Sequence, residues 1–159
     1  PHRDAVEAAL SGQPAAGDGP YAARAEALLS ANAEAIAAWF AGYDRMAAAV
    51  SHDRDVLTHG ETHPGNSMRT ADGWRLIDWD TALVAPPERD LWMLGEEMTA
   101  AYATATGVVA RPETIETYRR WWDVADLAVA VARFRGPHTG GEDDDSTWAI
   151  MERLVRQLS

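Results

Sequence analysis

Apolar residues recur at helical spacing along most of this 159-residue chain. Between Tyr21 and Val50 they lie three or four positions apart in an Ala-rich background, which predicts one long helix or two helices joined near Ser30 to Asn32. Ser30 and Asn32 are both suitable N-caps for a second helix, because each side chain carries an oxygen that accepts a backbone N–H. The same periodicity returns over residues 112–134, which begin with a proline at a favoured first helical position.

The middle of the chain breaks this periodicity. Residues 55–58 (DVLT) indicate a short extended segment, and residues 67–79 (SMRTADGWRLIDW) indicate a β-hairpin. The two strands of the hairpin flank Asp72-Gly73, a pair that favours tight turns because both residues tolerate a positive φ. Residues 85–95 (APPERDLWMLG) then predict a helix that starts after proline and ends at a glycine.

Two further helices are predicted over 96–106 and 142–158. The predicted fold class is therefore α+β, mainly α with one small β-hairpin. We expect a single domain, because 47% hydrophobic residues suffice for one core in a chain of this length. Its expected parts are a helical lead-in over 1–54, a loop, hairpin and following helix over 55–96, and a second helical region over 97–159.

The charge of the chain narrows the choice of partners. Its net charge is −11, its pI is about 4.7, and all 14 basic residues are arginine. Nucleic acid is an unsuitable partner, because its phosphates are bound by clustered Arg and Lys. The acidity suits a protein with a solubilising surface, or one whose small-molecule partner is cationic.

Cysteine is absent, which removes disulfides and thiolate chemistry from consideration. No apolar run approaches the roughly 20 residues that a membrane-spanning helix needs, and the first residues do not resemble a signal peptide. We therefore expect no membrane partner and a cytoplasmic location.

Polar residues suited to phosphoryl transfer cluster between positions 59 and 80. His59-Gly60-Glu61 is followed by Asn66, and then by Ile77-Asp78-Trp79-Asp80 at the end of the hairpin. Phosphoryl transfer needs a carboxylate that takes the proton of the acceptor hydroxyl, and oxygen ligands for Mg²⁺ at the nucleotide phosphates. Protein kinases place these groups in the order H-R-D-x-x-x-x-N and then Asp. The same order and the same acid-to-Asn interval occur here.

The stretch from about Asp55 to Gly95 resembles the catalytic core of the aminoglycoside phosphotransferase and choline kinase-like family. That family carries H-G-D-x-x-x-x-N, then I-D-[WF]-[DE], then a helix that begins Pro-x-x-Asp-Leu. The segments HGETHPGN, LIDWD and PPERDLWML match these motifs in order. The resemblance implies the C-terminal lobe of a protein-kinase-like fold, and the flanking helices suit that lobe.

The resemblance also implies a role for the matching positions. Glu61 stands where the catalytic base belongs, and Asn66 and Asp78 stand at the Mg²⁺-ligand positions. Three further residues would support the loop. His59 would brace it by hydrogen bonding, Asp90 would tie it to the following helix, and Asp80 would assist at the metal or order the turn. Trp79 and Trp92 are predicted to be core residues.

Glu61 departs from the family pattern, which has Asp at this position. Glutamate keeps the negative charge and a similar acidity, but its extra methylene moves the carboxylate by roughly 1 Å. A displacement of that size can lower the rate about a hundredfold, because positioning dominates this chemistry. Since Asn66 and Asp78 are retained, we interpret Glu61 as a working variant of the base. The alternative is a non-catalytic pseudokinase, either a metabolite-binding module or a regulatory one.

A kinase of this type also needs an N-terminal lobe, in which a Gly-rich hairpin covers the phosphates and a lysine bridges them to a helix Glu. This sequence has no lysine and no Gly-rich loop between strands. We therefore expect it to be the catalytic and acceptor-binding lobe of a small-molecule O-phosphotransferase that uses ATP or GTP and Mg²⁺. It would need the N-terminal lobe of the same polypeptide, and we expect the isolated chain to be inactive.

In the resembled family the acceptors are aminoglycosides, choline, sugars, amino alcohols and macrolides, bound mainly by the helical part of the C-terminal lobe. The run GGEDDDSTW gathers four acids at the start of a predicted helix: Glu142, Asp143, Asp144 and Asp145. Acids there complement the helix dipole and cap free N–H groups. The alternative is a rim that attracts a cationic acceptor, which would give these four residues a role in acceptor binding.

Overall fold

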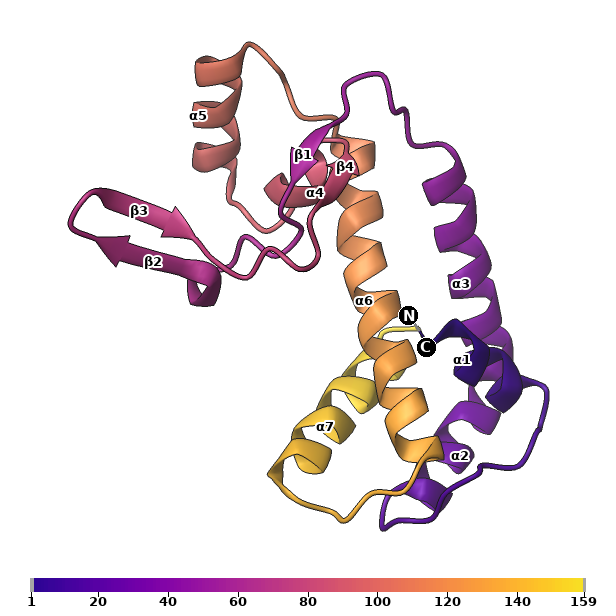
Figure 1. The fold of residues 1–159 in the computed structure, drawn as a ribbon. Coiled ribbons are helices and arrows are strands. Elements are labelled where there is room, and N and C mark those ends of the chain that lie inside the picture. Colours follow the sequence, from indigo (N-terminus) through magenta and orange to yellow (C-terminus); the bar gives the residue numbers. More distant parts are fainter. Residues whose placement is uncertain (1, 159) are drawn as a thin grey trace. The chain divides into compact units, whose positions relative to one another are not determined.

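The computed structural model describes residues 2–158, which form two compact units (Figure 1). We call them the helical unit, which comprises the residues up to Arg45 and from Trp121 onward, and the loop unit, from Met46 to Arg120. Helices make up most of the described chain and the strands are few and short. This confirms the predicted fold class.

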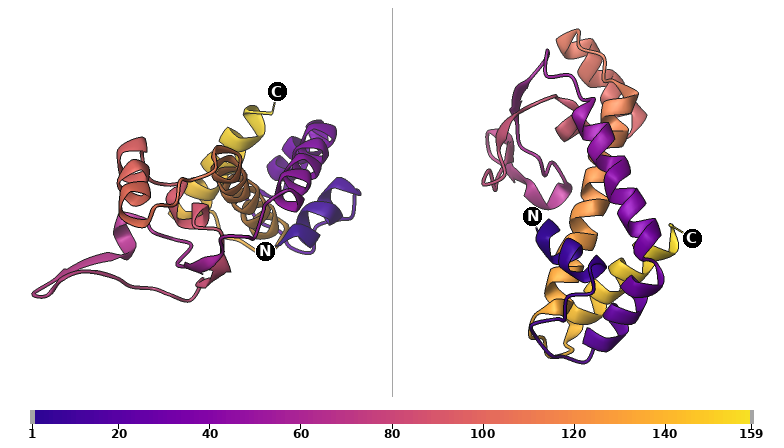
Figure 2. Two further views of the ribbon diagram at one scale, coloured as in Figure 1. Left: turned by 90° about the horizontal axis from the view of Figure 1, so that it is seen from above. Right: turned by 90° about the vertical axis from the view of Figure 1, so that its right-hand side faces the viewer.

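The helical unit is built around one apolar core. The segments that contribute to it are α1 (Arg3–Leu10), α2 (Ala22–Ala31), α3 (Ala33–Ala48), α6 (Pro112–Arg135) and α7 (Glu142–Arg156), of which α3 and α6 continue into the loop unit. Figure 2 shows these helices from two further directions. Leu127, Val131 and Phe134 of α6 are almost fully buried, because residues three or four apart lie on one face of a helix.

The helical stretch between Tyr21 and Val50 consists of two helices, one of the two arrangements that the sequence predicted. The break falls at Asn32, between the end of α2 and the start of α3. The side-chain amide of Asn32 donates to the carbonyl of Leu28 at 2.8 Å and so satisfies one of the free carbonyls at the end of α2. The first helix, α1, lies within the predicted helical lead-in, although its bounds were not predicted.

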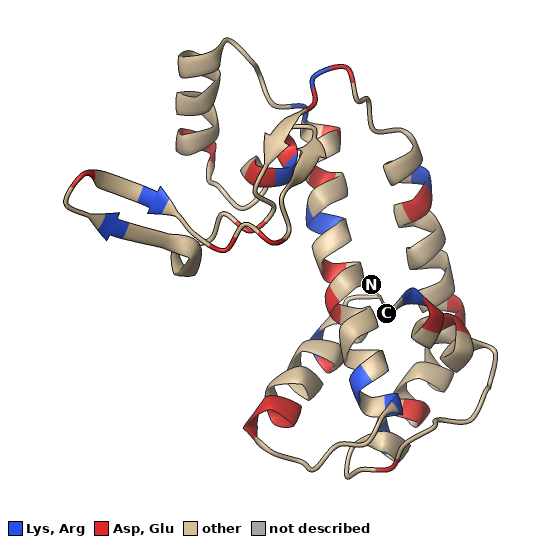
Figure 3. Ribbon diagram, in the orientation of Figure 1, with Lys and Arg blue, Asp and Glu red and all other residues tan. Residues whose placement is uncertain are grey.

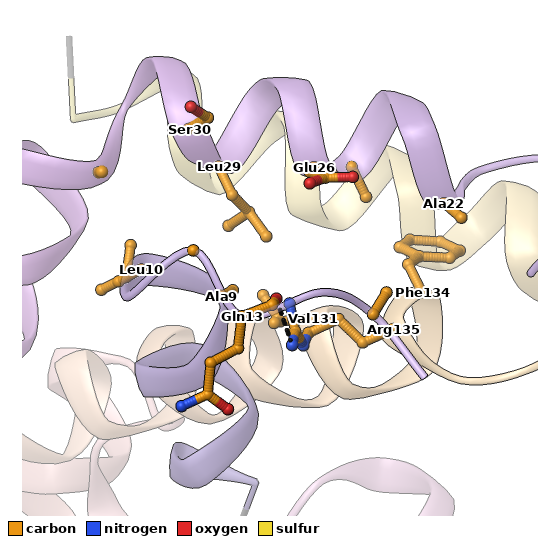
Figure 4. Close-up of a pocket in the computed structure, with 14 residues that line it drawn as sticks. Ala9, Leu10, Gln13, Ala22, Glu26, Leu29, Ser30, Val131, Phe134 and Arg135 are labelled. Atoms are coloured by element: carbon orange, nitrogen blue, oxygen red, sulfur yellow. Dashed lines mark hydrogen bonds between the residues drawn. The ribbon is translucent and has the colours of Figure 1, made fainter. Parts of the chain in front are cut away.

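A cavity of about 140 Å³ lies within the helical unit between α1, α2 and the end of α6 (Figure 4). Leu29 and Phe134 line it, together with Arg135. The guanidinium of Arg135 donates to the carbonyls of Gln13 at 2.9 Å and Pro14 at 3.2 Å. These bonds fasten the Gly/Pro-rich loop between α1 and α2 to the end of α6.

The loop unit contains two separate antiparallel strand pairs. In the first, Val56 pairs with Ala85 and Thr58 with Leu83; in the second, Ser67 pairs with Leu76. The elements in chain order are β1 (Val56–Thr58), the 3-10 turn η1 (Pro64–Asn66), β2 (Ser67–Thr70), β3 (Gly73–Leu76), β4 (Leu83–Ala85), α4 (Glu88–Leu91) and α5 (Glu96–Thr106). None of the helices in residues 2–158 has the length and apolarity needed to cross a bilayer.

The predicted hairpin is present as β2 and β3. Its turn lies one residue earlier than predicted, at Ala71 and Asp72, because Gly73 already pairs with Thr70 as the first residue of β3. Gly73 has a φ of 111° that favours glycine. Trp79 was predicted to be a core residue, and this is wrong, because 47% of it is exposed. The residues from 71 to 80 are all exposed, so the hairpin has no apolar face buried on a core for Trp79 to join.

The helix predicted over 85–95 is much shorter than expected. Its first predicted residue, Ala85, pairs with Val56 in β4, so the chain is still extended there. The α-helical turn α4 begins at Glu88, after two prolines, and ends at Leu91. The pairing of β4 with β1 therefore excludes Ala85 from the helix, and α4 starts after the two prolines that follow it.

Candidate active site

The loop after β1 is held by Asp90 of α4. One carboxylate oxygen accepts the backbone N–H of His59 at 2.9 Å, and the other accepts the N–H of Gly60 at 2.6 Å. The hydroxyl of Thr62 donates to the backbone carbonyl of Asp90 at 2.8 Å. Because charge-assisted bonds to a carboxylate are the stronger kind, this bracket fixes the first residues of the loop against α4.

His59 is buried at the centre of the loop, with 1% of its surface exposed. Its Nδ1 accepts the N–H of Glu61 at 3.2 Å, so the ring proton belongs on Nε2, which donates to the carbonyl of Ile77 at 2.8 Å. The ring of Trp79 packs edge-on against the imidazole with centroids 4.7 Å apart. Both ring nitrogens are occupied within the fold, and the imidazole links the backbone of Glu61 to that of Ile77.

Glu61 is held through its backbone. Its N–H is bound to His59, and its carbonyl accepts the side-chain amide of Asn66 at 3.0 Å. Within residues 2–158 no hydrogen bond or ion pair engages its carboxylate, and the residue is half-buried. The main chain of Glu61 is therefore fixed while its acidic group stays available.

The backbone of Asn66 is bonded to the residue before Asp78 at the base of the hairpin. The backbone N–H of Ile77 donates to the carbonyl of Asn66 at 2.9 Å, which places Asp78 one residue beyond this bond. Asp78 is exposed and has a φ of 65°, a left-handed conformation that Asp tolerates better than most residues. Asn66 is 7% exposed and is located at the end of η1.

The two side chains offer oxygen atoms of the kind that Mg²⁺ prefers. The amide nitrogen of Asn66 is committed to the Glu61 carbonyl, which leaves Oδ1 as the acceptor of that side chain. Asp78 adds a carboxylate. No group of three or more His, Asp or Glu residues in the described part of the chain is arranged to bind a metal. The donor atoms of the two side chains are chemically suited to Mg²⁺, an ion that usually takes its remaining ligands from water and phosphate oxygens.

A second layer behind the loop was not predicted from the sequence. The guanidinium of Arg89 donates to the hydroxyl of Thr58 at 2.9 Å and to the carbonyl of Thr81 at 2.8 Å, and the hydroxyl of Thr81 donates to the carbonyl of His59 at 2.7 Å. The glycine in His59-Gly60 permits a close approach by another group, because it has no Cβ. Nothing local in the sequence identifies Arg89 as that group, because it lies 29 positions later. Asp80 precedes Thr81 and is exposed.

The start of α4 is anchored by a buried charged network. Glu88 is fully buried, and its Oε1 accepts from the Arg54 guanidinium at 2.6 Å and from the Arg111 backbone N–H at 2.8 Å. Arg111 also forms two hydrogen bonds of 2.8 Å with Asp53, and this pairing holds the pKa of Asp53 well below its usual range. The network ties α4, and with it Asp90, to the segments on either side.

The four acids at the start of α7 belong to the helical unit (Figure 3). Asp144 is 1% exposed, and its carboxylate accepts from the Arg133 guanidinium and from the backbone N–H of Gly140. The bond from Arg133 lowers the pKa of Asp144. Both carboxylate oxygens of Asp144 are thus occupied within the fold. Glu142, Asp143 and Asp145 are exposed, and one carboxylate oxygen of Asp145 accepts from the hydroxyl of Tyr21.

The chain matches both a family profile and a known protein sequence. Residues 3–131 match the profile of the phosphotransferase enzyme family. Protein StrN of Streptomyces griseus is 40% identical over 162 residues, an alignment that covers 97% of this chain and 46% of StrN.

Solved structures share the fold. The AMP-bound complex of spectinomycin phosphotransferase, APH(9)-Ia, matches with a TM-score of 0.67 at 19% identity, over 96% of this chain and 54% of that protein. The complex of the same enzyme with ADP and spectinomycin matches with a TM-score of 0.64 at 18% identity, over 98% and 54%. The chain therefore spans about half the length of the relatives that it matches.

Proposed function

Because the chain belongs to the phosphotransferase enzyme family, we propose that it is the catalytic and acceptor-binding lobe of an ATP- or GTP-dependent small-molecule O-phosphotransferase. The observation that carries this proposal is the fixed backbone of Glu61 beside Asn66, in a loop bracketed by Asp90. A loop that is rigid in its main chain and leaves one carboxylate unengaged suits a reaction in which positioning dominates.

In this proposal Glu61 is the general base. Its carboxylate accepts the proton of the acceptor hydroxyl while the hydroxyl oxygen bonds to the γ-phosphorus and the bond from that phosphorus to the β–γ bridging oxygen breaks. The products are a phosphate monoester, a nucleoside diphosphate and protonated Glu61, which then releases its proton to water. General-base assistance typically contributes about 10²–10⁴ in rate.

Asn66 and Asp78 would hold Mg²⁺ through Oδ1 and the carboxylate. When bound, the ion neutralises charge on the nucleotide phosphates and orients them. The hydrogen bond from Asn66 to Glu61 supports this assignment, because it links the orientation of one metal ligand to the backbone of the base. His59, Asp90 and Asp80 have supporting roles in the loop.

The acceptor is proposed to be a hydroxylated small molecule of the aminoglycoside-like kind. The solved relatives were crystallised with AMP, ADP and spectinomycin, which supports a nucleotide co-substrate and a small-molecule acceptor. The exposed acids Glu142 and Asp143 would attract a cationic acceptor, and so would Asp145, which keeps one carboxylate oxygen beside the one that Tyr21 binds. Asp144 would not contact the acceptor, because both oxygens of its carboxylate are occupied by Arg133 and Gly140.

The test is a turnover assay on a longer polypeptide, in which an N-terminal lobe of the kind that the family carries precedes this chain. ADP or GDP release is measured with Mg²⁺ and a panel of aminoglycoside, aminocyclitol and amino-alcohol acceptors, with Glu61→Gln as the control. We expect release that depends on both acceptor and Mg²⁺, and almost none from the 159-residue chain alone. A longer polypeptide that binds an acceptor but transfers no phosphate would identify a non-catalytic module.

A further inference from the structure

Arg89 is a buried arginine with an unusual pair of partners. Only 6% of the residue is exposed, and its two hydrogen bonds go to neutral oxygens, the hydroxyl of Thr58 and the carbonyl of Thr81. Thr58 is the last residue of β1, immediately before His59, and Thr81 follows the Ile77 to Asp80 segment. One guanidinium therefore joins the start of the loop to the segment that carries Asp78.

The guanidinium also lies against the backbone of Gly60. A Cβ atom added to Gly60 would lie 2.2–2.5 Å from the guanidinium atoms of Arg89, far closer than van der Waals contact permits. Gly60 has a φ of 94°, which a residue with a side chain rarely adopts. The next residue is Glu61. The guanidinium therefore limits how closely the backbone can approach Arg89 at the residue just before the proposed base.

Two threonine hydroxyls extend the contact to both sides. Thr81 donates to the carbonyl of His59 at 2.7 Å, and Thr58 donates to the carbonyl of Leu83 at 2.8 Å. The loop is thus held on both sides of its backbone. Asp90 binds the N–H groups of His59 and Gly60. Thr81, which is itself bound by Arg89, binds the carbonyl of His59. Arg89 and Asp90 are consecutive in sequence, so α4 supplies both supports.

We propose that Arg89 is a positioning residue, whose guanidinium sets the place of the loop backbone that carries Glu61. Its consequence for catalysis rests on the function proposed above, whereas its effect on the loop does not. The planar guanidinium reaches two separate acceptors while covering Gly60, which the single ammonium of a lysine cannot do. Since both acceptors are neutral, the shape of the group matters here more than its charge.

The effect on the loop is tested in the 159-residue chain by amide hydrogen exchange. In Arg89→Lys we expect the His59 and Gly60 amides to exchange faster by roughly tenfold or more, because the loop opens locally. Amides inside α5 and α7 should keep their rates, which separates a local opening from a general loss of stability. Arg45→Lys, at an exposed arginine of α3, is the control and should leave the loop amides unchanged.

Should Arg89→Lys fail to fold, Thr58→Val provides the second variant. It keeps the shape of the side chain and removes the hydroxyl that Arg89 binds, so the same two amides should exchange faster. Unchanged exchange at His59 and Gly60 in a folded Arg89→Lys or Thr58→Val protein would overturn the proposal.

The effect on catalysis is tested by steady-state kinetics of Arg89→Lys in the longer polypeptide. A displaced base lowers kcat, by about a hundredfold for a shift near 1 Å, while the acceptor KM should change little. An equal kcat for Arg89→Lys and the parent would overturn the positioning role even if exchange is faster. If the parent itself shows no turnover, the proposed function fails, and hydrogen exchange still decides how Arg89 acts on the loop.

Discussion

The carboxylate of Asp90 accepts the backbone N–H of Gly60 at 2.6 Å, although thirty positions of sequence separate the two residues. Its other oxygen accepts the N–H of His59, so a single side chain satisfies two consecutive amides. The conformation of the loop therefore depends on α4, which starts after the two prolines that follow β4. Glu61, the candidate base, follows Gly60 directly, so its backbone position depends on these contacts.

Asp90→Asn should loosen the loop. An asparagine offers one carbonyl oxygen, and its NH₂ group would face the second backbone N–H, leaving that donor unsatisfied at a cost of about 1–3 kcal/mol. We expect a lower Tm, and in the longer polypeptide a lower kcat with little change in acceptor KM. The comparison is with Asp72→Asn, in the exposed turn of the hairpin, which should behave as the parent. Equal Tm values for the two variants would show that the bracket adds no stability.

Asp78→Asn should change the Mg²⁺ requirement and leave the fold intact. Asparagine tolerates the left-handed φ of this position as well as aspartate does, so the substitution removes only the charge. In the longer polypeptide we expect half-maximal turnover to need at least about tenfold more Mg²⁺, because even residues behind a metal ligand commonly change affinity by that much. An unchanged Mg²⁺ titration would remove Asp78 from the metal site.

Asp144→Asn should make the chain less stable in a way that depends on pH. The folded protein lowers the pKa of Asp144 through Arg133, so the carboxylate stabilises the fold above its unfolded pKa near 3.9. This contribution is lost as the pH falls through the folded pKa. The variant should therefore melt several degrees below the parent at pH 7, and the gap should narrow steadily as the pH falls below about 4.

Asp143→Asn is the matched control, since Asp143 is exposed at the same helix start. Its thermal midpoint should stay close to that of the parent over the whole pH range. A gap between the parent and Asp144→Asn that does not change with pH would mean that the Arg133 pairing does not stabilise the fold.

Local patterns in the sequence account well for the elements that depend on neighbours in the chain. The helix over 96–106 has the predicted bounds, α6 begins at Pro112 as expected, and the hairpin is present, although it turns at Ala71 and Asp72, one residue earlier than predicted. Each of these depends on residues only a few positions apart, through periodicity, a proline at the helix start, or turn-forming residues between two strands.

The features that the sequence did not predict depend on distant partners. In β4, Ala85 pairs with Val56, and this pairing keeps the first residue of the helix predicted over 85–95 extended. In the sequence, Arg89 has no feature that distinguishes it from other helix residues. Only the structure shows that its guanidinium lies against Gly60. Such contacts join segments about thirty residues apart, and neither periodicity nor a single motif contains that information.

The most direct test of the account is the kcat of Glu61→Gln in the longer polypeptide, measured with an acceptor that the parent phosphorylates. Glutamine keeps the size of the side chain and removes the proton acceptor, so kcat should fall by about 10²–10⁴ while acceptor binding changes little. Glu61→Asp should be milder, because it restores the acid that the family usually carries. Full activity in Glu61→Gln would contradict the account and reduce Glu61 to a scaffold position in the loop.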